Sequence, residues 1–326
     1  MEAIELAWTG RVTTRLGYGC SSLMGAVGRR ESLALLEAAW DAGVRHFDVA
    51  PMYGYGAAEG CVGEFLARHR GEATVTTKFG IPAGKNPGLL RAARRMLRPV
   101  LERVPALKKK LARAAASTVA VVEKSQFTAD EARASLEHSL RELRVERIDV
   151  WLMHEAEASD LGDEGLLRFC EDAVASGKIG AFGVGSERKR IPALMRERPE
   201  FCGVLQHDWS VFDETIGATA AFRIHHRSLT ENFSGLRETL ASDREMRAAW
   251  SREIGVNLDD PSVLAHLMLK AALVENPVSL ILVSSKKPAH IFDNVRVVGD
   301  ATLVEPARRL HALAVGVGNP QVAVAV

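Results

Sequence analysis

Short runs rich in β-branched residues alternate with amphipathic helical stretches along most of this 326-residue chain. The runs with the composition of buried strands are residues 14–19, 46–50, 73–79, 148–154, 179–183, 203–207, 222–225 and 278–283. Because helical stretches separate these runs, the pattern predicts β/α units around a parallel sheet. Eight such units favour a (β/α)8 TIM barrel, although a doubly wound sheet uses the same alternation.

End signals support several of the helices between these strands. Residues 30–42 read as a helix that Gly43 closes. Thr128 and Glu131 have the spacing of a capping box, and Asp260 before Pro261 is a helix cap followed by proline at the first helical position.

Charge and composition narrow the class of protein. The chain has 42 basic and 41 acidic residues, which gives no reason to expect nucleic acid as a partner. Its four cysteines lie far apart, so we predict reduced thiols and no metal site. No signal peptide and no apolar run of about 18–20 residues is apparent, which predicts a cytoplasmic protein without a transmembrane segment.

Polar residues at the ends of predicted strands are candidates for chemistry, since barrel enzymes place their active sites there. Lys78 ends a buried strand and needs a partner, for which Asp48 is the obvious candidate. A lysine beside Tyr53 would lower the pKa of that tyrosine and make it a proton donor for carbonyl reduction. His154 could orient a carbonyl oxygen. Taken singly, each residue could equally be a turn former or a core side chain.

Four segments, in order, resemble motifs of the aldo-keto reductase superfamily. Residues 47–56 with Glu59 resemble its D-x-A-x-x-Y-G signature, and residues 77–80 resemble its T-K-x-G. Residues 148–154 resemble I-D-x-x-x-x-H, and residues 284–294 resemble the segment that binds the adenosine phosphate. The matches run from Arg15 to Val297, and the chain is identified as a member of this superfamily, of the bacterial type.

The resemblance implies a barrel that binds NADP(H) and a catalytic tetrad of Asp48, Tyr53, Lys78 and His154, with Tyr53 as the general acid. It also implies a set of cofactor-binding residues: Gly19, Cys20, Ser21, Asp48, Ser186, Gln206, Ser284, Ser285, Lys286, His290, Asp293 and Asn294. Among these, Gln206 would hold the nicotinamide carboxamide, and Lys286 with Lys287 favours NADP over NAD.

Three departures from the family pattern stand out. Gly185 and Ser186 replace the serine and asparagine of a G-V-S-N segment, and His290 stands where arginine is common. Residues 224–229 replace an aromatic-serine-proline-leucine stretch, which leaves the pyrophosphate contacts undefined. Within that stretch, His225 and His226 should point to opposite sides of their strand, so they predict no metal site.

An insertion at 83–127, after the third strand, distinguishes this chain. Residues 85–113 carry ten basic side chains and one acidic one, which leaves 32 basic and 40 acidic residues elsewhere. The insertion predicts a basic amphipathic helix, either packed on the barrel with a solvated face or forming a lid that favours anionic substrates. We predict a single domain, 1–326, that contains it.

The predicted function is NADPH-dependent reduction of an aldehyde or ketone to an alcohol, or the reverse reaction. The predicted partner is therefore a small carbonyl or alcohol substrate. The alternatives are an NADP(H)-binding regulatory or scaffold protein of the same fold, and a barrel isomerase without a redox cofactor. The sequence predicts neither the substrate nor the oligomeric state.

Overall fold

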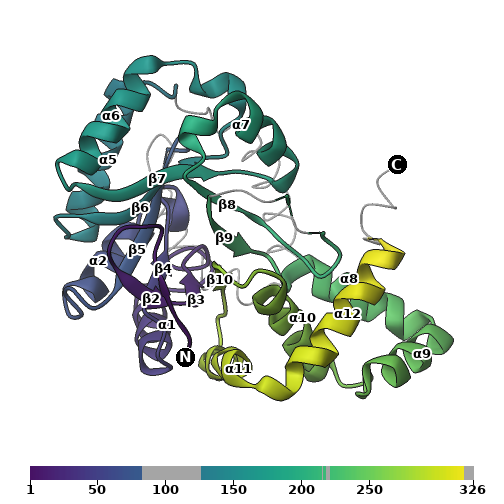
Figure 1. The fold of residues 1–326 in the computed structure, drawn as a ribbon. Coiled ribbons are helices and arrows are strands. Elements are labelled where there is room, and N and C mark those ends of the chain that lie inside the picture. The colour runs from purple at the N-terminus through teal and green to yellow at the C-terminus, as the bar shows by residue number, and fades with distance from the viewer. Residues whose placement is uncertain (83–125, 215, 218–220, 319–326) are drawn as a thin grey trace, which may run out of the picture.

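The computed structural model describes residues 1–82, 126–214, 216–217 and 221–318 (Figure 1). Its centre is a closed barrel of parallel strands in the order β10-β3-β4-β5-β6-β7-β8-β9. These strands are β3 (Leu16–Gly19), β4 (His46–Asp48), β5 (Thr74–Phe79), β6 (Ile148–His154), β7 (Ile179–Gly185), β8 (Val204–Asp208), β9 (Phe222–His226) and β10 (Ser279–Val283). The predicted (β/α)8 barrel is confirmed, and each predicted strand ends within two residues of the observed one.

Helices surround the barrel. They are α1 (Arg29–Asp41), α2 (Ala58–Leu66), α5 (Ala129–Leu143), α6 (Glu164–Ala175), α7 (Ile191–Glu197), α8 (Thr230–Ser242), α9 (Arg244–Ile254), α10 (Pro261–Glu275), α11 (Pro288–Gly299) and α12 (Val304–Val317). Short 3-10 turns are η1 (Tyr53–Tyr55), η2 (Ala158–Leu161), η3 (Arg188–Arg190), η4 (Pro199–Phe201) and η5 (Ala301–Leu303). None of the helices in these described ranges is long and apolar enough to cross a membrane.

The predicted helix ends are confirmed, although only half of the predicted capping box forms, because the Thr128 backbone N–H donates to the Gln126 carbonyl at 2.8 Å and not to Glu131. Thr128 accepts a hydrogen bond from the Glu131 backbone N–H at 3.4 Å, and Asp260 accepts one from the Ser262 N–H at 2.8 Å. Gly43 follows α1 with φ +96°, a conformation that glycine adopts without strain. The basic helix predicted in residues 85–113 lies outside the described residues. Of the insertion at 83–127, only Gln126 and Phe127 are described.

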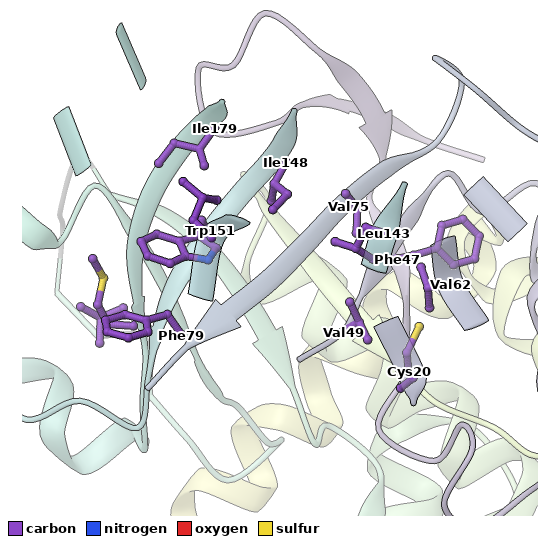
Figure 2. Packing of buried hydrophobic residues seen from close by; sticks show 14 of the residues in the cluster. Cys20, Phe47, Val49, Val62, Val75, Phe79, Leu143, Ile148, Trp151 and Ile179 are labelled. Atoms are coloured by element: carbon purple, nitrogen blue, oxygen red, sulfur yellow. The ribbon is translucent and has the colours of Figure 1, made fainter. Parts of the chain in front are cut away.

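The outward faces of the strands pack against the helices. Figure 2 shows Phe79 and Trp151, from the neighbouring strands β5 and β6, lying side by side, with ring centroids 5.3 Å apart and planes 12° from parallel. In the same apolar cluster, the rings of Phe47 of β4 and Phe65 of α2 pack with their centroids 4.6 Å apart. This apolar layer fixes the strands and therefore the positions of the side chains inside the barrel.

The barrel interior is divided into an apolar part and a polar part. Buried apolar side chains from β6, β8, β9 and β10 form one cluster, namely Val150, Leu152, Val204, Phe222, Ile224, Leu280 and Leu282. The interior residues of β4 and β5 are polar instead and are linked by hydrogen bonds: His46, Asp48, Thr74, Thr76 and Lys78. The N-terminal hairpin of β1 (Ala3–Glu5) and β2 (Val12–Thr14) lies at the N-terminal end of the barrel, where Leu6 joins the apolar cluster.

Two glycines of α2 give a matched test of how tightly this helix packs on α5. A methyl group on Gly63 would overlap the backbone oxygen of Glu142, whereas a methyl group on Gly60 would meet only the carboxylate end of the Glu142 side chain. We expect Gly63→Ala to lower the free energy of unfolding by about 1–3 kcal/mol through overpacking. Gly60→Ala should be neutral or stabilising by up to about 1 kcal/mol, because alanine has the higher helix propensity. Urea unfolding measures both, and equal stability of the two variants would contradict this packing.

Candidate active site

A buried ion pair lies inside the barrel at the C-terminal ends of β4 and β5. The Lys78 ammonium, with its residue 2% exposed, donates a 2.6 Å hydrogen bond to Asp48 Oδ1 and a second, at 3.1 Å, to the carbonyl of Val49. The pairing of these two residues predicted from the sequence is confirmed. The short β4 run and the longer β5 run bring them together because the strands pair in parallel, with Asp48 opposite Thr76.

Gln206 completes the environment of the carboxylate. Its side-chain amide donates a 2.7 Å hydrogen bond to Asp48 Oδ2. Because β8 and β4 are not neighbours in the barrel, this contact crosses the interior and places both side chains inside it. Asp48 thus accepts one hydrogen bond from a cation and one from an amide, each on a different oxygen.

Tyr53 is held beside this pair by the tight turn of η1. Gly54 has φ +60°, and a side chain there would collide with Met24, so the turn depends on glycine at this position. The ring centroid of Tyr53 lies 5.5 Å from Lys78 Nζ and 6.2 Å from the ring of His154, which meets it edge to face. The four predicted tetrad residues are therefore gathered at one end of the barrel.

The pKa of Tyr53 differs from the sequence-based prediction. Lys78 lowers this pKa, as predicted, but burial raises it more, and Asp48 raises it further, so that the net shift is upward from 10.0. The prediction of a lowered pKa is wrong because it left out the desolvation of the phenolate. Burial, followed by the charge of Lys78, lowers the pKa of His154 to about 3, so its imidazole is neutral near pH 7.

A second histidine was missed by the sequence analysis. In β9, Ile224 belongs to the interior cluster, so His226, two residues further on, faces the same way at the C-terminal end. Its strand partner on β8 is Asp208, and burial lowers the pKa of His226 to about 3. The predicted strand ended one residue too early; a longer strand would have put His226 among the polar strand-end residues.

His225 and His226 point to opposite sides of the strand, as predicted, and the structure shows that His225 is the one that faces away from the interior. Its ring lies 4.6 Å from that of His207, and neither of its nitrogens has a hydrogen-bond partner among the described residues. Among all the residues that the structure describes, no three His, Cys, Asp or Glu side chains form a group that could hold a metal ion.

The residues expected to hold the nicotinamide half of a cofactor occupy different environments. Cys20 is fully buried: its backbone N–H donates to the Asp48 carbonyl at 2.8 Å, and its thiol lies 3.7 Å from the Tyr18 carbonyl. Ser21 is exposed, and Gly19 is partly exposed. Ser186 is buried and donates its hydroxyl hydrogen to the Ala156 carbonyl at 2.9 Å, which leaves its oxygen as an acceptor.

The residues expected to hold the adenosine phosphate cluster where β10 meets α11. Ser284, Lys286 and His290 are exposed there. Helix α11 begins at Pro288 without a side-chain cap. Pro288 has no N–H, and the His290 N–H donates to the Lys287 carbonyl at 3.1 Å. The positive end of the helix dipole, beside basic side chains, is still suited to a phosphate. This part of the chain therefore fits the phosphate of NADP(H).

Three other residues expected at this junction have defined surroundings. The Ser285 hydroxyl oxygen accepts a hydrogen bond from the Lys287 backbone N–H at 3.1 Å. Asp293 pairs with Arg296 at 3.2 Å, and Asn294 is partly exposed.

Comparison with known proteins agrees with this geometry. The model of the Aldo/keto reductase family matches residues 15–200 of the chain, more than half of its length. The chain therefore belongs to the Aldo/keto reductase family, and the family identification from the sequence motifs is confirmed.

Among curated proteins, D-threo-aldose 1-dehydrogenase from Pseudomonas sp is 34% identical over 195 residues, which cover 55% of this chain and 52% of that protein. Pyridoxal 4-dehydrogenase from Microbacterium luteolum is 29% identical over 229 residues, 65% of this chain and 64% of the other. The chain thus matches less than two thirds of the length of each. A solved aldo-keto reductase from Klebsiella pneumoniae in complex with NADPH has the same fold, with a TM-score of 0.64 at 18% identity over 97% of this chain and 96% of that one.

The buried pair predicts strong energetic coupling between Lys78 and Asp48. Asp48→Asn leaves a buried cation without its partner and should cost about 3–5 kcal/mol of unfolding free energy, and Lys78→Met should cost a similar amount. The double variant should lose much less than the sum, because neither charge is then left alone. Urea unfolding of the wild type, the two single variants and the double variant gives the coupling energy between Lys78 and Asp48. Additive losses would show that the two charges do not interact in the folded protein.

Proposed function

We propose that this protein is an NADP(H)-dependent oxidoreductase that interconverts a carbonyl group and an alcohol, with Tyr53 as the general acid in reduction. The observation that carries the proposal is the convergence of Tyr53, His154 and the Lys78–Asp48 pair at the end of the barrel where the exposed basic side chains of the β10–α11 junction also lie. Membership of the Aldo/keto reductase family supports it.

The proposed proton transfer follows from the charges of these residues. Because its pKa is raised, Tyr53 carries its proton at neutral pH and has it ready to donate to a carbonyl oxygen. Lys78, 5.5 Å from the ring centroid, then stabilises the phenolate that forms. Asp48 and the Val49 carbonyl hold Lys78 in that position.

His154 has a different role in this proposal. Its neutral imidazole, edge-on to the Tyr53 ring, orients the carbonyl oxygen toward the tyrosine hydroxyl. A charged imidazole would compete with Tyr53 for the role of acid, and its burial near Lys78 prevents this. NADPH supplies the hydride when it is bound.

We assign the cofactor contacts according to the groups available. The carbonyl oxygen of Gln206 and the hydroxyl oxygen of Ser186 are acceptors for the nicotinamide carboxamide: the one hydroxyl hydrogen of Ser186 is donated to Ala156, and one of the two amide hydrogens of Gln206 is donated to Asp48. Lys286 and the α11 N-terminus take the 2′-phosphate, which favours NADP over NAD.

The proposed substrate class is a small polar aldehyde or its hemiacetal. The names of the two curated relatives, an aldose dehydrogenase and a pyridoxal dehydrogenase, support this class. The interior-facing pair of Asp208 and His226 adds polar groups at the same end of the barrel, where hydroxyl groups of a substrate can bind. The preference for anionic substrates that we associate with the basic insertion stays a prediction.

Turnover against a panel of aldehydes tests the reaction. NADPH oxidation is measured with aldoses, pyridoxal and simple neutral and anionic aldehydes, for the wild type and Tyr53→Phe. We expect activity on at least one of these, and Tyr53→Phe should lower kcat by about 10²–10⁴-fold with unchanged NADPH affinity. NADPH binding without turnover of any carbonyl would favour the regulatory alternative, and absence of binding of either dinucleotide would contradict both.

The cofactor assignment has its own test. Lys286→Ala should weaken NADPH binding by about tenfold and leave NADH binding nearly unchanged, because only NADPH carries the 2′-phosphate. Lys178→Ala, which removes an exposed lysine at the N-terminal end of β7, is the matched control. Fluorescence titration of each variant with both cofactors measures the effect. An equal loss of affinity for NADPH and NADH would show that Lys286 does not bind the 2′-phosphate.

A further inference from the structure

A chain of hydrogen bonds lies inside the barrel beneath the Lys78–Asp48 pair. Thr13 Oγ1 lies 2.8 Å from Thr74 Oγ1, and Thr74 Oγ1 donates to the Arg45 carbonyl at 3.0 Å. His46 joins the chain at both ring nitrogens: Nδ1 lies 3.0 Å from Thr74 Oγ1, and Nε2 lies 3.1 Å from Thr76 Oγ1. All of these side chains except Arg45 are buried.

The hydrogen-bonding capacity of Thr74 assigns the tautomer of His46. A hydroxyl group has one hydrogen to donate and two lone pairs that accept. Since Thr74 donates to the Arg45 carbonyl, it accepts from Thr13 and from His46, so His46 carries its hydrogen on Nδ1. The bare Nε2 then accepts the hydroxyl hydrogen of Thr76.

The opposite tautomer satisfies fewer contacts. With the hydrogen on Nε2, the Thr74 hydroxyl would have to turn to Nδ1 and would lose the Arg45 carbonyl. The Thr76 hydroxyl would become an acceptor from His46, and its own hydrogen would be free to point elsewhere. Only the Nδ1–H form makes all four contacts at once.

The direction of the Thr76 hydroxyl matters because of what lies beside it. Thr76 is the strand partner of Asp48, on the same interior face of the barrel. Asp48 already accepts from Lys78 on one oxygen and from Gln206 on the other. Thr76 and Asp48 share no side-chain hydrogen bond in the structure, but a Thr76 side chain released from His46 could rotate its hydroxyl group toward this carboxylate and compete with the ammonium group for it.

We propose that His46 is a positioning residue for the Lys78–Asp48 pair: as the Nδ1–H tautomer it holds the Thr76 hydroxyl hydrogen away from Asp48 and leaves the carboxylate to Lys78 and Gln206. The consequence for catalysis rests on the function proposed above, whereas the tautomer and its effect on the ion pair do not. His46 touches no reacting atom, so it acts through Thr76.

The charge state of His46 agrees with this role. Burial, followed by the charge of Lys78, lowers the pKa of His46 to about 3, so the ring is neutral throughout the working range of the protein. The other titratable groups that face the pair are Tyr53 in η1, Cys20 after β3, His154 on β6 and His226 on β9. The negative charge of Asp48 raises the pKa values of both Lys78 and Tyr53. A hydrogen bond from Thr76 to Asp48 would weaken the effect of this charge and would therefore lower both pKa values.

Nuclear magnetic resonance tests the tautomer directly. In protein labelled with ¹⁵N-histidine, His46 should show a protonated Nδ1 and a bare Nε2 from pH 8 down to pH 5, and the missing signals of His46→Gln identify it among the ten histidines. A protonated Nε2, or a charged ring at pH 6, would overturn the proposal whether or not the protein has activity.

Two substitutions of His46 test the hydrogen bonds of its two ring nitrogens separately. Counted in bonds from Cα, the amide of asparagine stands at the place of Nδ1 and that of glutamine at the place of Nε2. His46→Asn therefore keeps the bond to Thr74 and frees Thr76, whereas His46→Gln keeps an acceptor for Thr76 and loses Thr74. Each variant loses one hydrogen bond, so the two are matched in the stability they give up.

The first comparison needs no turnover. The coupling between Lys78 and Asp48, measured by the double-variant cycle above, should fall by about half or more in His46→Asn and stay near the wild-type value in His46→Gln. Equal coupling in the two backgrounds would show that His46 is only a packing residue and would overturn the proposal.

The second comparison uses the activity. His46→Asn should lower kcat by about fivefold or more with little change in KM, and it should move the alkaline limb of the pH profile to lower pH. His46→Gln should stay within about twofold of the wild type and keep its profile. Wild-type inactivity toward every carbonyl would count against the proposed function, and the tautomer and the coupling would still decide the role of His46. If His46→Asn and His46→Gln were both active with the pH profile of the wild type, the positioning role of His46 would be overturned.

Discussion

The buried ion pair of Lys78 and Asp48 is the interaction on which the rest of the site depends. A cation that is 2% exposed is stable only with a partner of opposite charge and with hydrogen bonds for its other donors, and Asp48 and the Val49 carbonyl provide them. The pair dictates what its neighbours can be. Together with burial, which has the larger effect, the charge of Lys78 lowers the pKa values of His154 and His46. Lys78 also opposes the effect of burial on the pKa of Tyr53, whereas Asp48 adds to it. Asp48 accepts a hydrogen bond from the amide of Gln206 across the barrel.

The barrel accommodates this pair by dividing its interior. Most of the strands supply aliphatic and aromatic side chains that fill the space without polar atoms. The polar side chains are concentrated on β4 and β5, where threonine hydroxyls and one imidazole satisfy one another beneath the charges. A polar group without such partners would cost free energy in this environment, so the hydrogen-bonded chain supports the ion pair as much as it fills space. The N-terminal hairpin takes part through Thr13, which links the far end of the barrel to the same chain.

Particular residues show how far the sequence leads. Asp48, Lys78 and His154 could be found because each ends a recognisable strand, and parallel strands bring their C-terminal ends together. His226 was missed because the predicted strand stopped one residue short, an error within the usual uncertainty of strand ends. The upward shift of the Tyr53 pKa was missed for a different reason. The sequence shows that a lysine is near, but desolvation depends on how many atoms surround the hydroxyl, which only the folded chain defines.

The sequence by itself determined the barrel, the helix ends, the family and the candidate catalytic residues, because these follow from local periodicity and from short motifs. Only the tertiary structure decided which hydrogen bonds those residues make. Gln206 was expected to contact a cofactor and is found to bind Asp48 as well, and Cys20 was expected at the cofactor and is found fully buried. His46 carried no signal in the sequence beyond its place before Asp48. Its tautomer follows from two threonines 28 and 30 residues further along the chain, and strand pairing alone brings these within reach.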